Sequence, residues 1–291
     1  MLMGPAVIAA SAVQVNVLIN SGFAARLGDG PVSWLNIAFR LMQLPLGIFG
    51  VAVGTVTLPL VSRTAALGDM AAFRSALAHA IRLVTLLTIP AAIGLIILAQ
   101  PIISVIYEHG RFTPEATRQT AGALQFYAIG LAAYSAVKVL APAFYALDKR
   151  YLPMVVSIFS IAINFLLNWF FMFKVGLGHR GLALSTSLVA LTNFLLLYIM
   201  MRKYAGPLET GAILGLLAKL VIPALLLAGI CWLALEFLFQ SGAPLPEWEK
   251  IIGMLVVIAL AATVFFGSAF LLRVTEVRDI VDLIRQRFRR A

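Results

Sequence analysis

The chain has 291 residues, of which 62% are hydrophobic and only 12% are charged, and its mean hydropathy is +1.00. A soluble domain of this size carries about 25% charged residues, so this composition excludes that class. Apolar runs near or above about 18 residues recur along the whole length, which is typical of a polytopic α-helical membrane protein. We therefore interpret the net charge of +10 as a topology signal and not as a nucleic-acid-binding surface.

The apolar runs predict about eight transmembrane helices in an all-α fold. In chain order they cover residues 5–27, 32–61, 72–104, 116–146, 152–173, 181–203, 211–240 and 249–272. Short loops with glycine, proline and charged residues separate them. Several spans exceed the roughly 20 residues that a bilayer requires, so these helices must tilt, bend or project beyond it.

The last two spans differ in amino-acid composition from the first six, and they follow the polar segment 205–211. We expect a six-helix unit over residues 1–204, a two-helix appendix over 205–272 and a tail over 273–291. The tail has the pattern of an amphipathic helix that can lie on an anionic inner leaflet, although a solvated helix with no specific role stays open. Its apolar face is formed by Val277, Ile280, Val281, Ile284 and Phe288.

Lysine and arginine are distributed unevenly between the two sets of loops. One set, which includes the tail, holds 13 of them, and the opposite set holds 6. The richer side is expected to be cytoplasmic, which places the C-terminus inside. The three basic residues that remain are Arg40, Lys138 and Lys219, and all three fall within predicted spans.

Arg40 lies in the second span, roughly 9 Å deeper than the interfacial Trp34 at about 1.5 Å per residue. No acidic residue lies at comparable depth in its own or a neighbouring span, because the intramembrane Glu236 belongs to the seventh. An intramembrane arginine without a carboxylate faces a wet cavity or meets an anion, and its planar fork suits phosphate. The alternative is a snorkelling or distantly paired side chain.

Lys138 lies in the fourth span, near the bilayer midplane, about 15 Å from the turn at 148–150 at the rise of an α-helix. A lysine at that depth is expected to face a polar interior. A neutral buried lysine, or a pairing with Glu236, is the alternative.

Residues that bend helices are frequent in the second span. Proline removes a backbone hydrogen bond, and glycine lets helices approach closely or flex. Together they predict a bendable, cavity-lining helix of the kind that exposes a site to each side of a membrane in turn. The residues expected to bend are Pro45, Gly47, Gly50, Gly54 and Pro59 in this span and Pro142 in the fourth.

Uncharged polar residues recur in the first and fifth spans. Asn164 and Asn168 are four residues apart and share a helix face, and the first span carries Gln14, Asn16 and Asn20. Such groups indicate interhelical hydrogen bonds, or an ion or substrate site. The sequence shows no close pair of intramembrane carboxylates, no metal-ligand spacing and no nucleophile–base pair, so we expect a transporter and not an enzyme.

Four stretches, in order and with natural spacing over about residues 5–203, resemble the MurJ/MviN lipid II flippases. They are residues 30–50 (GPVSWLNIAFRLMQLPLGIFG), 107–113 (YEHGRFT), 138–146 (KVLAPAFYA) with Pro153, and 181–187 (GLALSTS). These flippases are related to the multidrug and polysaccharide-lipid exporters. The resemblance implies one six-helix lobe of a two-lobe exporter fold, with two extra C-terminal helices that form a groove for a lipid tail.

The resemblance also implies a substrate and a site. The substrate is an undecaprenyl-pyrophosphate-linked peptidoglycan precursor, moved from the inner to the outer leaflet of the bacterial cytoplasmic membrane by alternating access. The chain then corresponds to a C-terminal portion, whether fragment, truncated gene model or split protein, and its partner is a first lobe that it lacks. We assign the diphosphate cavity to Arg40, Lys138, Asn36 and Gln43.

Family members with a sodium site use polar and acidic groups at positions that resemble Asn20, Asn164, Asn168 and Thr186. Both would-be acids, at 20 and 168, are asparagine in this chain, and amides coordinate sodium weakly without a carboxylate. We expect no cofactor, and membrane potential is the alternative driver. Two other functions stay open: another exporter of the same superfamily, carrying drugs or other polyprenyl-linked saccharides, and a non-transporting scaffold for cell-wall enzymes.

Overall fold

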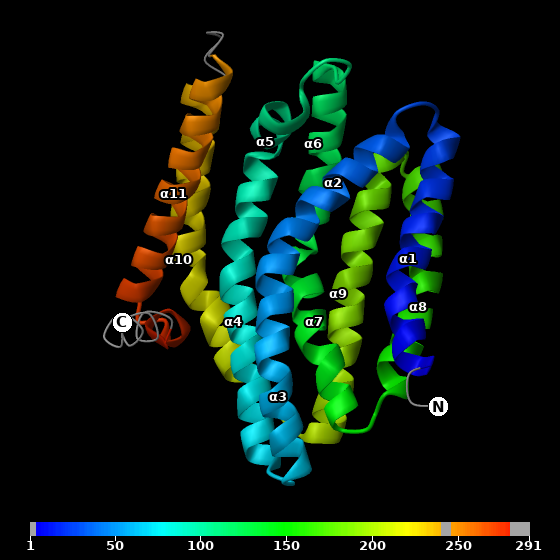
Figure 1. Cartoon of the computed structure of the whole chain (residues 1–291), viewed down its shortest axis with the longest axis vertical. Coiled ribbons are helices and arrows are strands. Elements are labelled where there is room, and N and C mark those ends of the chain that lie inside the picture. Colours follow the sequence, from blue (N-terminus) through cyan, green and yellow to red (C-terminus); the bar gives the residue numbers. More distant parts are fainter. Residues whose placement is uncertain (1–3, 240–245, 280–291) are drawn as a thin grey trace.

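A computed structural model describes residues 4–239 and 246–279, and every regular element in that part of the chain is helical (Figure 1). The prediction of an all-α polytopic membrane protein is confirmed. In chain order the elements are α1 (Gly4–Ala24), η1 (Ala25–Leu27), α2 (Pro31–Pro45), η2 (Leu46–Val51), α3 (Ala52–Ala66), α4 (Met70–Ile97), α5 (Ala99–Tyr107), α6 (Pro114–Ile129), α7 (Leu131–Ala146), α8 (Tyr151–Trp169), η3 (Phe170–Lys174), α9 (Gly178–Ala205), α10 (Thr210–Ala234), η4 (Leu235–Phe239) and α11 (Glu247–Leu271).

Among the described residues, six helical stretches are long and apolar enough to cross a membrane, or seven if the bent pair α6–α7 forms one span. The helix α1, with 21 residues, corresponds to the first expected segment. Each of the eight expected segments therefore maps onto a helix or onto a broken helix. The division into a six-helix unit and a two-helix appendix stays a prediction.

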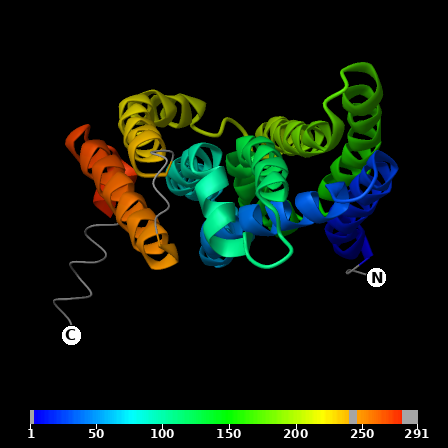
Figure 2. The same cartoon turned by 90° about the horizontal axis from the view of Figure 1, so that it is seen from above.

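The helices α10 and α11 stand side by side at one edge of the bundle, and α1 and α8 stand at the opposite edge (Figures 1 and 2). Contact between the α10–α11 pair and the other helices runs mainly through α4 and α5. The connections α3–α4, α7–α8 and α9–α10 lie at the lower end in Figure 1, and α1–α2 and α5–α6 lie at the upper end.

Two expected spans are broken and not continuous. Residues 72–104 divide between α4 and α5, and residues 116–146 divide at Gly130, where α6 and α7 meet at 46°. A Cβ atom on Gly130 would lie 2.8 Å from the Cα of Ser187 on α9, so only glycine fits the close approach. The Ser187 hydroxyl donates to the carbonyls of two residues near the end of α6, at 2.6 and 3.1 Å. Backbone groups freed inside a membrane require such partners, so α9 stabilises the bend.

The second expected span is a helical run of 36 residues, Pro31–Ala66, in which a π-helical turn, η2, follows Pro45. Two of its glycines face α7. A Cβ on Gly54 would lie 2.8 Å from the carbonyl oxygen of Lys138, and one on Gly50 would lie 3.2 Å from the Cα of Ser135. In this structure the two glycines permit close helix packing, and their expected role in bending stays a prediction.

Buried side chains form three clusters along the bundle. One joins α3, α4, α7 and α9 around Phe73 and Phe144, and a second joins α2, α5, α6 and α9 around Met42 and Leu124. The third joins α4, α10 and α11 around Phe265. The first two hold together the helices that line the polar cavity described below.

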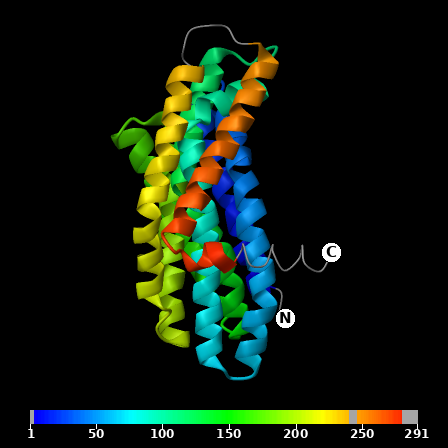
Figure 3. The same ribbon diagram turned by 90° about the vertical axis from the view of Figure 1, so that its left-hand side faces the viewer.

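The beginning of the predicted tail packs on the protein. Residues 275–279 form a short helical segment that crosses the end of α11 (Figure 3). Val277, which we expected on a lipid-facing surface, is only 4% exposed and belongs to the third cluster. The other residues of the expected apolar face, from Ile280 to Phe288, lie outside the described part of the chain.

The close approach of α3 to α7 predicts a position-specific effect of a single methyl group. We expect Gly54→Ala to lower the free energy of unfolding by about 1–3 kcal/mol, because the added Cβ meets backbone of α7. The matched control is Gly47→Ala in the same helical run, where nothing lies within 4 Å. Thermal unfolding in detergent measures both variants, and equal midpoints would contradict the packing role of Gly54.

Candidate functional site

One face of α2 is polar. Asn36, Arg40 and Gln43 are spaced by four and three residues, so they share that face. Arg40 and Gln43 are exposed and Asn36 is half-buried. Within the described residues, the Arg40 guanidinium has no hydrogen-bond or ion-pair partner. Glu236 is exposed on η4 and forms no ion pair with Arg40 or Lys138.

A cavity of about 450 Å³ lies next to this face and is enclosed by α1, α2, α7, α8 and α9. It brings together Lys138, which is exposed on α7, and Gln43. Its other polar lining residues are Gln14, Asn16, Tyr134, Tyr145, Ser157, Ser160 and Asn193. A cation and several amides that converge on one hollow can bind an anion through charge-assisted and neutral hydrogen bonds.

Two polar atoms at this cavity are buried without a partner. They are the side-chain carbonyl oxygens of Asn16 and Asn193. Buried polar atoms are nearly always paired, so unpaired ones at a cavity indicate capacity for a polar ligand. Sequence reasoning noted Asn16 but missed Asn193, Ser157 and Ser160, because an isolated serine or asparagine in an apolar helix gives no signal of which way it faces.

The other two expected cavity residues lie nearby on α2. Asn36 borders a separate hollow of about 20 Å³, which α1, α2, α6, α7 and α9 enclose. Arg40 lies on the exposed face between Asn36 and Gln43 and does not line either hollow. The structure therefore groups Lys138 with Gln43, and Arg40 lies exposed about one turn before Gln43 on the same face of α2.

The four residues expected at an ion site form one buried hydrogen-bond network between α1, α8 and α9. Asn168 Nδ2 donates to Asn20 Oδ1 at 2.7 Å and to Asn164 Oδ1 at 3.1 Å. Asn20 Nδ2 donates to Thr186 Oγ1 at 2.8 Å, and Ser185 Oγ donates to Asn168 Oδ1 at 2.6 Å. Each of the four expected residues is at most 6% exposed.

This network does not fit a sodium ion. Its side-chain oxygens already accept hydrogen bonds, and no carboxylate belongs to it. Amide and hydroxyl oxygens alone give a cation no charge balance. The network instead joins three helices through neutral hydrogen bonds, which inside a bilayer contribute to helix association.

An apolar groove of about 460 Å³ lies between the α10–α11 pair and the helices α2, η2, α4 and α5. Leu44, Pro45 and Ile48 form one wall, and Leu227 and Phe266 belong to the opposite wall. The groove lining also includes the buried thiol of Cys231, the chain's one cysteine.

The helix α2 and the turn after it separate the polar cavity from the apolar groove. Gln43 lines the cavity, and the next two residues, Leu44 and Pro45, line the groove. Neighbouring residues in a helix point about 100° apart, since 3.6 residues make a turn. One helix therefore presents a polar surface to one compartment and an apolar surface to the other.

The residues expected to bend lie in different surroundings. Pro45 borders the groove and Pro142 borders the cavity, whereas Gly47 and Pro59 are exposed. Their part in a conformational change stays a prediction. Among the described residues, no group of three or more His, Cys, Asp or Glu side chains could hold a metal ion.

Known proteins match most of this chain. The family model described as "Lipid II flippase MurJ" covers residues 1–248. The lipid II flippase MurJ of Burkholderia cenocepacia is 34% identical over 271 residues, which are 93% of this chain and 52% of that protein. The probable lipid II flippase MurJ of Rickettsia prowazekii is 35% identical, over 94% of this chain and 54% of that protein. The chain thus spans about half the length of the curated relatives it matches.

Solved structures share the fold. A structure titled "Lipid II flippase MurJ, inward closed conformation" superposes with a TM-score of 0.68 at 24% identity, over 90% of this chain and 53% of that one. An outward-facing multidrug resistance transporter of the MATE family superposes with a TM-score of 0.57 at 18% identity, over 97% of this chain and 66% of that one.

The family model and these relatives confirm the resemblance found in the four sequence stretches. The chain belongs to the MurJ family of lipid II flippases.

Proposed function

We propose that this chain forms half of a transport path that moves lipid II, an undecaprenyl-diphosphate-linked peptidoglycan precursor, from the inner to the outer leaflet by alternating access. The observation that carries this proposal is the shared wall formed by α2 and its π-helical turn. It has a polar cavity on one side and an apolar groove on the other. A substrate with an anionic, hydrophilic head and a long hydrocarbon tail requires both compartments at once.

The polar compartment supplies the counter-charge for the diphosphate. Lys138 contributes a point charge inside the cavity, and Arg40 contributes a planar fork on the exposed face of α2, one turn from the cavity-lining Gln43. A guanidinium binds phosphate oxygens through two parallel, charge-assisted hydrogen bonds. In this role neither cation requires a carboxylate partner, which accounts for two basic side chains in spans that hold almost no acid.

The groove supplies the apolar compartment. Its lining is almost wholly hydrocarbon, and α10 and α11 form its outer wall. A polyprenyl tail in this groove would stay in apolar surroundings while the head occupies the cavity across α2.

A second six-helix lobe would complete the path. The relatives are about twice as long as this chain, and the polar face of α2 that carries Arg40 and Gln43 is exposed. A partner lobe that covers this face would turn the half-open cavity into a chamber between two lobes, which can open to either side of the membrane.

We place the chain in the bacterial cytoplasmic membrane, as the family implies, with the C-terminus in the cytoplasm. The basic loops at the lower end in Figure 1 support this orientation. Since the buried amide network lacks a charge, we propose the membrane potential as the driver. Export of cationic drugs is disfavoured because Lys138 and Arg40 would repel a cation.

The diphosphate role of Arg40 predicts a specific loss of transport. In a protein that also contains the first lobe, Arg40→Gln is expected to lower the transport rate at least roughly tenfold, since a hydrogen bond to a charged group contributes about 1.5–3 kcal/mol. Complementation of a flippase-depleted bacterium, with immunodetection in the membrane fraction, measures it. Arg63→Gln is the matched control, because it removes the same charge from an exposed position on α3. Normal growth with Arg40→Gln would refute the role.

The uncharged amide network predicts transport without sodium. Replacement of sodium by potassium in membrane vesicles is expected to change the transport rate by less than about twofold, because no carboxylate balances a bound cation. A lipid II translocation assay at fixed membrane potential measures this rate. Loss of transport in potassium that sodium restores would contradict the prediction.

A further inference from the structure

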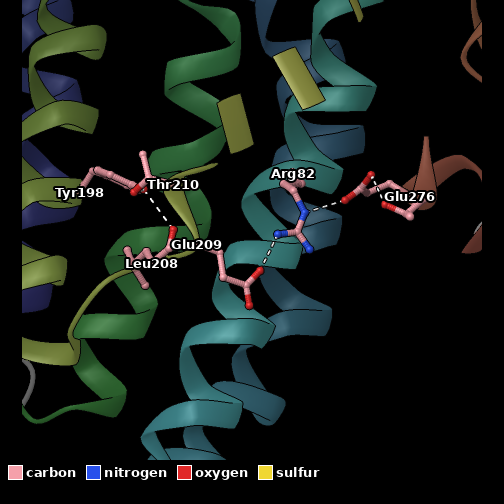
Figure 4. Close-up of polar contacts among 7 residues, drawn as sticks. Arg82, Tyr198, Leu208, Glu209, Thr210 and Glu276 are labelled. Atoms are coloured by element: carbon pink, nitrogen blue, oxygen red, sulfur yellow. Dashed lines mark hydrogen bonds and ion pairs between the residues drawn. The ribbon is translucent and has the colours of Figure 1, made fainter. Parts of the chain in front are cut away.

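Arg82, on α4, joins three segments that are far apart in the sequence (Figure 4). Its Nη1 atom lies 2.8 Å from Glu209 Oε2, in the connection between α9 and α10. Its Nε atom lies 2.6 Å from Glu276 Oε1, in the segment that follows α11. Arg82 lies within the expected span 72–104, but its role as a bridge was missed.

Two of the three side chains in this cluster are well protected from solvent. The side chains of Arg82 and Glu276 are 14% and 3% exposed, whereas that of Glu209 is 40% exposed. Burial favours the neutral form of the Glu276 carboxyl, but hydrogen bonds from its own backbone, Arg82 and Thr275 hold its pKa below the ordinary value. The carboxylate is therefore charged at neutral pH, and the guanidinium is its counter-charge.

The connection between α9 and α10 is fixed by further contacts on both sides of Glu209. Arg74, two turns before Arg82 on α4, donates to the carbonyl of Ala205 at 2.9 Å. The Tyr198 hydroxyl lies 3.2 Å from the Leu208 carbonyl and 2.8 Å from Thr210 Oγ1 (Figure 4). Glu209 itself has a φ of 30°, in the left-handed region that L-residues rarely adopt, so surrounding contacts hold it there.

The rest of the contact between the α10–α11 pair and α4 is apolar. The cluster that joins them includes Leu86, Leu220 and Phe265. In a bilayer such packing has little hydrophobic driving force, because lipid tails are as apolar as leucine. Directional polar contacts therefore contribute more to the position of α10 and α11 against α4. Arg82 supplies such contacts both at the start of α10 and just after the end of α11.

We propose that Arg82 is a positioning residue that sets the width of the apolar groove by fastening the two groove helices to α4 at one end. The proposal rests on the proposed function only for the statement that the groove holds a lipid tail. Without Arg82, α10 and α11 can shift relative to α4, and the opposite walls of the groove then move apart.

The native cysteine offers a direct probe of groove width. Cys231 lines the groove, is 1% exposed and is the one cysteine of the chain. We expect Arg82→Gln to raise the rate at which N-ethylmaleimide labels Cys231 in membrane vesicles by roughly tenfold, equivalent to a fall of about 1.4 kcal/mol in the free energy of local opening. Arg82→Lys is expected to be intermediate, because a lysine reaches one carboxylate well but lacks the fork that reaches two.

Matched variants separate this effect from a general one. Arg63→Gln removes the same charge from an exposed position and is expected to leave the labelling rate unchanged. Glu209→Gln removes the more exposed of the two ion pairs of Arg82. It therefore tests the proposal if Arg82→Gln fails to accumulate. The proposal would be overturned if folded Arg82→Gln were labelled at the same rate as Arg63→Gln. If Arg82→Gln does not accumulate, the same comparison is made with Glu209→Gln.

Labelling of Cys231 requires no substrate, so this test is independent of transport. Faster labelling of Arg82→Gln together with unchanged lipid II translocation would support the positioning role and contradict the proposed use of the groove. Faster labelling together with reduced translocation would support both.

Discussion

Arg40 puts a charge inside an apolar span, and this charge constrains how α2 can face its surroundings. A guanidinium in hydrocarbon is costly unless it meets water or an anion, so α2 must turn the face of Arg40 away from lipid. That face continues through Gln43 to the polar cavity that Lys138 shares. The opposite requirement holds at Leu44 and Ile48, which border an apolar groove. The run formed by α2 and η2 meets both requirements, with a polar surface on one side and an apolar surface on the other. The proposed substrate likewise has a polar head and an apolar tail.

The need to satisfy backbone polar groups inside a membrane shapes the remaining helices. The bend between α6 and α7 is stable because Ser187 reaches the carbonyls that the break frees. At the break between α4 and α5, Gln125 donates to the carbonyl of Ile96 at 3.0 Å. The neutral network around Asn168 connects α1 to α8 and α9 by the same principle. These helices are thus held by polar contacts between segments that lie far apart in the sequence, set within apolar clusters.

Much of this organisation could be predicted from sequence, and particular residues show why the rest could not. Long apolar runs located the spans, because hydropathy and helix length are local properties. The spacing of Asn164 and Asn168 placed them on one face, and the structure brings both together with Asn20 and Thr186.

The break at Gly130 was missed because it depends on Ser187, 57 positions along the chain. The same is true of the bridge made by Arg82, because its partners Glu209 and Glu276 lie 127 and 194 positions further along the chain. Contacts between distant segments carry no local pattern. For Arg40, the depth and the lack of a nearby acid follow from sequence, but the cavity beside its helix face depends on how α7 and α9 pack near α2.

We infer that α2 and η2 separate the head of the substrate from its tail, and photo-crosslinking can test this separation. A photoreactive amino acid at Gln43, in the cavity, and another at Ile48, in the groove, would be irradiated with lipid II in a protein that contains both lobes. We predict, by mass spectrometry, adducts to the saccharide–peptide head from position 43 and to the polyprenyl tail from position 48. Adducts to the same part of the lipid from both positions, or the same tail labelling from exposed Val56 as from Ile48, would contradict the account.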